Sequence, residues 1–169
     1  MDREKLESIL DLHRKWLYNE EGGERADLYG ADLYGANLRG ADLYGADLRG
    51  AKNAAVAQAM TEIVPREGSF VGWKQCRCGL IVKLRIPEDA KRSNATGRKC
   101  RASKVEVLAI ESVDGKEQFD TALSLWDESF SYNVGETIEV ADFDEDRFHK
   151  CAAGIHFFIT REEAVDFDF

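Results

Sequence analysis

The feature that most constrains the fold is a run of five-residue repeats between Ala26 and Gly50. It reads ADLYG ADLYG ANLRG ADLYG ADLRG, and a sixth unit begins at Ala51 and dissolves into KNAA. A period of five gives no apolar stripe on an α-helix, where each residue advances by about 100°. On a flat strand, an odd period would turn successive leucines to opposite faces. The unit must therefore be a structural repeat that turns the chain by a constant angle, which predicts a solenoid.

The residue types within each repeat agree with a solenoid. Each leucine can fill a narrow interior, and each alanine is small enough to point inward at a tight side. The Asp or Asn can hydrogen-bond the backbone of the turn, and the glycine tolerates conformations that other residues resist. We expect the leucines to share one interior: Leu28, Leu33, Leu38, Leu43 and Leu48.

The A[DN]LxG run resembles the pentapeptide-repeat proteins. The resemblance implies a right-handed, four-sided β-helix with one pentapeptide per side, so that one coil takes about twenty residues. This chain would then hold little more than one coil, with Leu48 stacked on Leu28 and Arg49 over the ring of Tyr29. One coil cannot bury its own ends, so we expect other parts of the chain to cap it.

The flanking sequence predicts three regions: a capping helix at 1–21, the repeat coil at 22–60 and a C-terminal domain at 61–169. Apolar residues in 2–19 follow the i, i+3, i+4, i+7 spacing of an amphipathic helix. We expect this helix to cover the first open end of the coil; the alternative is that it packs on the C-terminal domain. Residues 54–60 form either a short helix or an irregular last side of the coil.

The C-terminal region predicts an α+β domain with a mostly antiparallel sheet. Apolar or alternating runs bounded by turn residues indicate strands at 70–73, 80–86, 104–110, 132–134, 137–140 and 155–159. A brief helix is expected at 120–129, and Thr160 is expected to be the N-cap of a helix that begins after it.

A second resemblance covers most of residues 65–165. It depends on Gly72-Trp73-Lys74, on 91–101 (KRSNATGRKCR), and on 151–158 (CAAGIHFF) with 161–164 (REEA). This pattern is similar to an uncharacterised domain that follows pentapeptide repeats in some phage and bacterial proteins. The resemblance implies a phage or bacterial provenance and carries no known activity.

Composition predicts a protein of the bacterial host cytoplasm. The formal net charge of −9 argues against bulk attraction to nucleic acid or to an anionic membrane. No apolar run approaches the roughly 20 residues of a membrane span, and the first residues, MDREKLESIL, are too charged for a signal peptide. Four unevenly spaced cysteines do not resemble a disulfide scaffold.

The most informative local chemistry is the basic run at 91–101, which contains no acid. Backbone N–H groups, hydroxyls and guanidinium groups of such a loop can converge on a phosphate. The alternative is that the loop docks on the acidic segment 111–146, where twelve Asp or Glu accompany one Lys, or that it is solvated. The candidate anion site consists of Lys91, Arg92, Ser93, Thr96, Arg98, Lys99, Arg101 and His156.

Metal and catalytic interpretations are weaker. Cys76, Cys78, Cys100 and Cys151 could bind zinc, but only one close pair exists and its spacing is not C-x₂-C. The acidic turn at 142–146 begins like a calcium loop and then departs from that motif. His156 has no partner in a recognised catalytic motif, so a buried, hydrogen-bonded histidine is favoured. We expect no metal and no cofactor.

The sequence therefore favours a non-catalytic protein that captures a phosphate-bearing ligand, such as a nucleotide or a nucleic-acid end, with the repeats as an assembly platform. One alternative is an enzyme centred on His156, with Cys151 or a carboxylate as its partner. Another is a DNA mimic that binds topoisomerase, for which the coil is short. A host protein is an alternative partner. An uncovered coil edge predicts a homo-oligomer.

Overall fold

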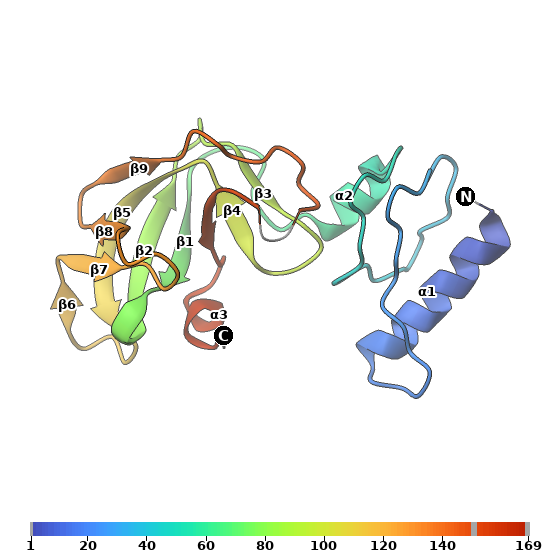
Figure 1. Ribbon diagram of the computed structural model, residues 1–169, viewed down its shortest axis with the longest axis horizontal. Helices are drawn as coiled ribbons and strands as arrows, with labels where there is room; N and C mark the ends of the chain where they lie inside the picture. Colours follow the sequence, from blue (N-terminus) through green and yellow to red (C-terminus); the bar gives the residue numbers. More distant parts are fainter. Residues whose placement is uncertain (1, 150–151, 168–169) are drawn as a thin grey trace. The chain divides into compact units, whose positions relative to one another are not determined.

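The computed structural model describes residues 2–149 and 152–167, which form two compact units (Figure 1). The first, called the repeat unit, contains the chain up to Glu62 together with Asn94–Gly97 and a segment that begins at Asp146. The second, called the C-terminal unit, contains most of the remaining chain from Ile63 onward. Each unit has its own apolar core.

The repeat unit begins with helix α1, Arg3–Leu17, whose apolar face lies in the same core as the repeat leucines. Leu6 is buried there. His13 is also buried, and its Nδ1 accepts a hydrogen bond of 3.1 Å from the backbone N–H of Ala26, while its ring stacks on Trp16. These contacts join the helix to the start of the repeats.

Within the repeats, backbone groups pair with partners twenty residues further along the chain. Asp27 pairs with Asp47, and Asp32 with Lys52, in parallel bridges. All five repeat leucines are buried in one cluster, each at most 4% exposed. The guanidinium of Arg49 lies 5.7 Å from the ring centre of Tyr29. The expected twenty-residue spacing, the shared interior and this ring contact are therefore confirmed.

The polar residue of each repeat forms the same local hydrogen bond. The side-chain Oδ1 of Asp or Asn accepts from the backbone N–H two residues later, at distances of 2.8 to 3.2 Å. The glycine of every repeat, from Gly30 to Gly50, has a φ between 62° and 78°, a conformation that a side chain would strain. Each turn is closed by the N–H of the alanine that follows it, which donates to the carbonyl of the repeat leucine, so the turn depends only on neighbouring residues.

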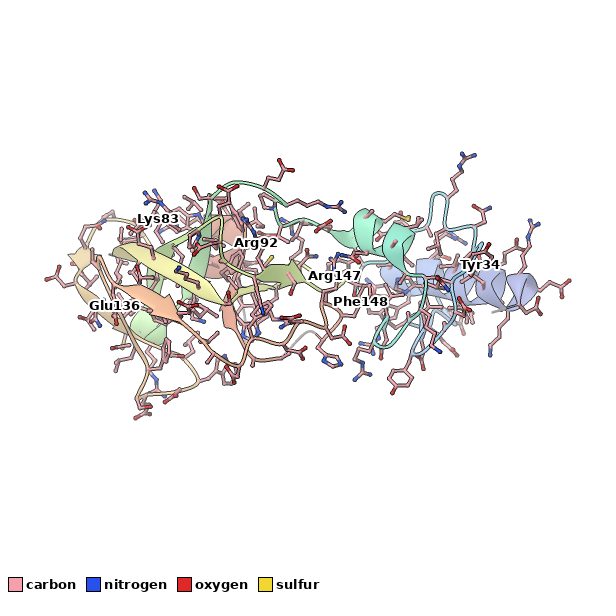
Figure 2. The ribbon with its side chains drawn as sticks, turned by 90° about the horizontal axis from the view of Figure 1, so that it is seen from above. Tyr34, Lys83, Arg92, Glu136, Arg147 and Phe148 are labelled. Carbon is pink, nitrogen blue, oxygen red and sulfur yellow. The ribbon has the colours of Figure 1, made fainter. Side chains whose placement is uncertain are left out.

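Two short segments that are distant in sequence complete the repeat unit. The carbonyl of Thr96 accepts from the N–H of Gly45 at 3.0 Å, and its hydroxyl donates to the carbonyl of Ala46 at 2.7 Å. Arg147 donates to the carbonyl of Asn94 at 2.7 Å, and the adjacent Phe148 packs on the repeat core (Figure 2). Helix α2, Ala55–Thr61, follows the last repeat.

The C-terminal unit is organised around an antiparallel sheet (Figure 1). Its strand order is β1 (Phe70–Gln75), β2 (Leu80–Ile86), β5 (Lys104–Ser112) and β6 (Gln118–Phe119), and β9 (Thr137–Glu139) also pairs with β5. A 3₁₀ turn at Arg77–Gly79 joins β1 to β2. The central strands β2 and β5 supply most of the buried aliphatic side chains of the core.

Two smaller sheets and one helix surround it. Strands β10 (Ile155–Phe157), β4 (Cys100–Ala102) and β3 (Arg92–Asn94) form one sheet, and β7 (Thr121–Leu123) pairs with β8 (Ser131–Asn133). Helix α3, Arg161–Val165, begins after Thr160, whose hydroxyl and backbone N–H exchange hydrogen bonds with Glu163. This capping box confirms the expected N-cap. The α+β class with mostly antiparallel pairing is also confirmed.

Two local expectations are wrong. Residues 120–129 form strand β7 and a turn instead of a helix, because Thr121 and Leu123 alternate with the buried Ala122 and Asp127 caps a turn by accepting from the N–H of Ser129. The basic run at 91–101 is not one loop, since it contributes strands β3 and β4. In the part of the chain that the structure describes, no helix is long and apolar enough to cross a membrane.

Candidate functional site

The candidate site lies where strand β1 meets the end of strand β10 in the C-terminal unit. Trp73 and Phe158 exchange backbone hydrogen bonds of 2.8 and 2.7 Å. Strand β1 thus pairs with β2 and also, through this bridge, with the residue that follows β10. The bridge brings the residues after Trp73 close to β10, the strand that carries His156.

A narrow pocket opens at this junction. It offers about 20 Å³ of space for the centres of water-sized groups. Its lining is half polar or ionisable and half apolar: Lys74, Gln75, Lys99 and His156 on one hand, and Leu125, Trp126, Phe158 and Phe167 on the other. Small-molecule sites also combine a few converging polar groups with aromatic side chains, but they are usually far larger than this pocket.

Two polar atoms of this lining are buried and have no hydrogen-bond partner among the described residues. They are the Nε2 of His156 and the Oε1 of Gln75. A buried polar atom without a partner costs roughly 1–3 kcal/mol, and such atoms are uncommon in folded proteins. Both atoms can therefore bond a water or a ligand group that enters the pocket.

The two lysines of the pocket contact aromatic rings. The ammonium of Lys74 lies 5.7 Å from the ring centre of Tyr132, and that of Lys99 lies 5.1 Å from the ring centre of Phe167. No ion pair joins either lysine to a carboxylate within residues 2–149 and 152–167. Burial and the charge of Lys99 lower the pKa of Lys74. The lysine charge that Lys99 brings to the pocket is therefore not paired with any acid of the described chain, whereas burial disfavours the charged form of Lys74.

His156 is uncharged at neutral pH. Burial lowers its pKa to about 4, and the neighbouring charges of Lys99, Lys74 and Arg101 act in the same direction. An anion in the pocket would oppose these three charges and favour the protonated imidazole. The groups that perturb His156 are all cations, which does not match a catalytic histidine oriented by a carboxylate.

Cys76 is poorly suited to act as a nucleophile. Burial raises the pKa of the Cys76 thiol to about 11, so it remains protonated at neutral pH. Cys151, the partner considered from the sequence, lies outside the described residues.

Most cations of the basic run are held by the protein itself. Lys91 pairs with Glu145, and Arg98 pairs with Glu163. Arg92 donates to the carbonyls of Gly68 at 2.6 Å and Glu88 at 2.9 Å. Its guanidinium also lies over the ring of Phe70.

Arg101 is almost completely buried, at 2% exposed, and donates to the carbonyls of Asp144 and Ala153. The pairs of Lys91 and Arg101 agree with the alternative in which the basic run docks on the acidic segment.

The remaining members of the predicted set are divided. Thr96 belongs to the repeat unit, where it bonds Ala46. Ser93 is buried and its hydroxyl has no hydrogen-bond partner among the described residues. Of the eight candidates, the structure brings Lys99 and His156 into one pocket. It adds Lys74 and Gln75, which the sequence analysis did not select.

The metal interpretations find no geometric support in the described chain. Among residues 2–149 and 152–167, no three His, Cys, Asp or Glu side chains are grouped to hold a metal ion. Cys76 and Cys100 are buried, and the Sγ of Cys100 donates to the carbonyl of Arg98. Cys78 is exposed in the 3₁₀ turn with a φ of 59°.

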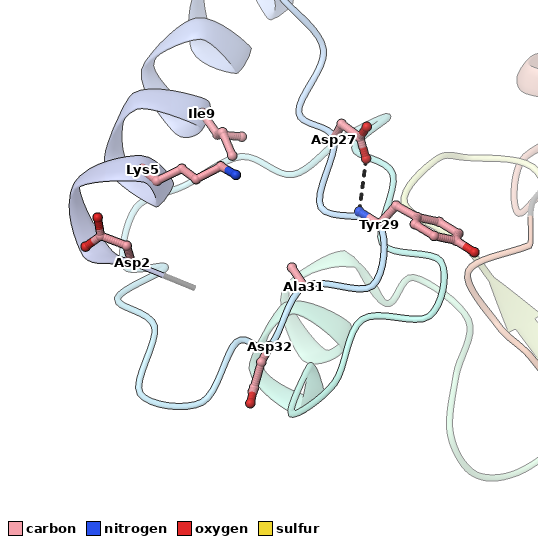
Figure 3. A pocket seen from close by; sticks show the side chains of 7 residues that line it. All are labelled: Asp2, Lys5, Ile9, Asp27, Tyr29, Ala31 and Asp32. Carbon is pink, nitrogen blue, oxygen red and sulfur yellow. Dashed lines mark hydrogen bonds between the residues drawn. The ribbon is translucent and has the colours of Figure 1, made fainter.

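A second pocket lies in the repeat unit between α1 and the first repeats (Figure 3). Its lining combines Asp2, Lys5, Ile9, Asp27, Tyr29, Ala31 and Asp32. Asp27 and Asp32 already accept hydrogen bonds from the backbone of their own turns, and Asp32 accepts another from Asn53. This pocket is larger than the one at His156, about 310 Å³ against about 20 Å³, but no described residue of its lining has a buried polar atom without a partner. We therefore take the pocket at His156 as the candidate site.

Comparison with known families covers both units. Residues 24–52 match the profile of pentapeptide repeats, and residues 60–164 match that of a family of unknown function, DUF5758. The chain belongs to the DUF5758 family. A repeat region joined to a DUF5758 domain fits a non-catalytic protein. No curated protein and no solved structure matches the chain.

Lys74 and Gln75 belong to the DUF5758 domain and were missed because β1 was expected to end at Trp73. The strand continues to Gln75, and Cys76 after it is fully buried. The available signal in the sequence was a lysine and a glutamine that directly follow the aromatic run and directly precede a cysteine.

Proposed function

We propose that this protein is a non-catalytic binding protein that captures a phosphate-bearing ligand in the pocket at His156. The observation that carries the proposal is the pair of buried, unpartnered atoms, His156 Nε2 and Gln75 Oε1, beside two lysines that no carboxylate of the described chain neutralises. A nucleotide or the end of a nucleic acid has the required chemistry.

The charge distribution supports an anion. The whole chain carries a formal charge of −9, yet the ionisable groups that line this pocket are Lys74, Lys99 and His156. A cationic pocket in an acidic protein attracts anions locally while the remaining surface repels extended polyanions. This combination favours a small phosphate compound or a strand end over a long duplex.

The aromatic lining supports an organic ligand over a bare ion. Trp126 is 71% exposed, and it lines the pocket together with Phe158 and Phe167. The indole offers a flat apolar face at the pocket, and a flat ring or sugar can pack against it.

Binding of phosphate compounds tests the proposal directly. Isothermal titration calorimetry should detect inorganic phosphate weakly and adenosine monophosphate more tightly. Replacing Lys74→Met or Lys99→Met should weaken adenosine monophosphate binding by about tenfold or more, because each change removes a charge-assisted contact.

The matched control is Lys91→Met, which removes a lysine that pairs with Glu145 outside the pocket lining. Its affinity for adenosine monophosphate should stay within about twofold of the wild type, because surface ion pairs contribute little. Failure of the wild type to bind any phosphate compound, with folding verified by circular dichroism, would overturn the proposal.

We further propose that the repeats form a right-handed, four-sided β-helix of little more than one coil that serves as a homo-oligomerisation platform. The support is the backbone pairing at a spacing of twenty residues, as between Asp27 and Asp47. A coil this short leaves strand-like edges that a second copy can cover. Light scattering at two protein concentrations should give a mass above that of one chain; a monomer at both would refute the platform.

The proposed setting is the cytoplasm of a bacterium, including one infected by a phage. Cys76, Cys78 and Cys100 are free thiols, as expected in a reducing compartment. Sequestering a nucleotide is a purpose that such a protein could serve there.

A further inference from the structure

The depth of the pocket restricts which part of a ligand can enter it. The space of about 20 Å³ is little more than one water-sized group requires. A phosphate is larger than that, so it must remain outside this space, beside the less buried Lys99; the ammonium of Lys74 faces the ring of the buried Tyr132. The group that reaches His156 and Gln75 must therefore be a different and smaller part of the ligand.

The two unpartnered atoms define what this small group must be. The Oε1 of Gln75 can only accept a hydrogen bond, and a fully ionised phosphate has none to donate. The Nε2 of a neutral imidazole donates or accepts according to its tautomer, and the pKa of His156 keeps the ring neutral. A hydroxyl donates one hydrogen bond and accepts others, so it satisfies both atoms with either tautomer.

We propose that the ligand inserts a hydroxyl group between Gln75 and His156 while its phosphate contacts Lys99 at the mouth. The ligand class is then a hydroxyl-bearing phosphate ester, and the ribose of a ribonucleotide supplies such a hydroxyl together with a ring for Trp126. This inference rests on the proposed function and narrows it from any phosphate compound to a phosphate ester that carries a hydroxyl group.

Selectivity should follow from the unpartnered atoms. A ligand that lacks the hydroxyl leaves His156 Nε2 and Gln75 Oε1 buried without partners, whereas the hydroxyl ligand satisfies both. Sites that hydrogen-bond a substrate hydroxyl discriminate strongly against analogues without it. We expect a loss of affinity on the order of tenfold to a hundredfold when the hydroxyl is removed.

Two matched ligand pairs test this selectivity by calorimetry. Adenosine monophosphate is compared with its 2′,3′-dideoxy analogue, and glycerol 3-phosphate with propyl phosphate. In each pair the hydroxyl compound should bind at least about tenfold more tightly. Equal affinities within both pairs, with inorganic phosphate still bound, overturn the hydroxyl inference and leave the proposed function standing. No binding of any compound, phosphate included, overturns the proposed function itself.

A variant assigns the selectivity to Gln75. Gln75→Leu removes the acceptor and keeps a side chain of similar size, so the preference within each pair should shrink several-fold while inorganic phosphate binds as before. Gln118→Leu, the same change at an exposed position on β6, should leave the preference intact. If Gln75→Leu keeps the full preference, a bound water satisfies Gln75 in the wild type and the inference is wrong.

Discussion

The two units of this protein satisfy their polar groups in opposite ways. In the repeat unit, the same side-chain bond to a backbone N–H two residues later occurs in all five repeats. In the C-terminal unit, Arg101 depends on carbonyls more than forty residues away, and two pocket atoms have no partner among the described residues. The Nε2 of His13 in the repeat unit also has no partner among the described residues, so such an atom marks a candidate site only where it lines a pocket, as at His156.

The largest expected effect is a loss of stability when a leucine is removed from the interior of the repeats. Leu43→Ala removes a side chain that is 2% exposed in the shared interior of the repeats. The free energy of unfolding should fall by about 3–5 kcal/mol, because a thin coil has few atoms that can fill the cavity. Denaturant titration followed by circular dichroism measures it.

Tyr34→Ala is the control for this prediction, since Tyr34 belongs to a repeat but is 85% exposed (Figure 2). It should cost no more than about 0.5 kcal/mol. A similar loss for both variants would contradict the idea that the inward leucines stabilise the coil.

The next prediction disturbs the C-terminal unit by overfilling it. A Cβ added at Gly72 on β1 would lie 2.5 Å from the Cδ2 of Phe157 and 3.0 Å from the Cδ1 of Ile86. Gly72→Ala should therefore lower the free energy of unfolding by about 1–3 kcal/mol. Because Gly72 lies next to Trp73, which bridges to Phe158, the change should also weaken ligand binding at the pocket. An unchanged denaturation midpoint in guanidinium would show that β1 and β10 adjust without cost.

The same contrast explains how much could be predicted from the sequence. The repeats and the Thr160 capping box depend on neighbours within a few residues, so their patterns determine them. Strand β4 could not be found in this way, because the burial of Arg101 depends on Asp144, Ala153 and the ring of Phe143.

The candidate site was predictable only in part for the same reason. Lys99 and His156 carry recognisable chemistry, but their grouping with Lys74 and Gln75 is a consequence of the bridge between Trp73 and Phe158. Charge runs indicate which residue types are present; the fold decides which of them remain available. In this protein most of the basic run is engaged by backbone carbonyls and acids of the chain itself.

Acidification should lower the free energy of unfolding through His156 in the pocket. The pKa of His156 is lowered from 6.5 to about 4, so the unfolded chain binds a proton at a higher pH than the folded one. The stability contributed by the neutral ring is complete above pH 6.5 and is lost as the pH falls towards 4. Since the ring is partly exposed, we expect a loss of about 1–2 kcal/mol, below the roughly 3 kcal/mol that the full shift implies.

The measurement is the free energy of unfolding between pH 7 and pH 4 for the wild type and for His156→Phe. The variant should lose less stability over this range, and the remaining loss should include His13, whose pKa burial also lowers. Sulfate, whose charge does not change in this range, should bind the wild type more tightly as the pH falls, since an anion favours the protonated ring. Equal pH slopes for both proteins would mean that His156 is not held neutral by its surroundings.

The smallest expected effect tests the local rule of the repeats. Asn37 is the one repeat position of its kind that is not aspartate, and its Oδ1 accepts from the N–H of Arg39 at 3.2 Å. Asn37→Ala should cost about 0.5–1 kcal/mol, the usual net value of one hydrogen bond. Asn37→Asp keeps the acceptor and should stay within about 0.5 kcal/mol of the wild type. If Asn37→Asp and Asn37→Ala were equally destabilising, the neutral amide of Asn37 would matter and its acceptor oxygen would not. The hydrogen bond shared by the five repeats would then not explain the residue found at this position.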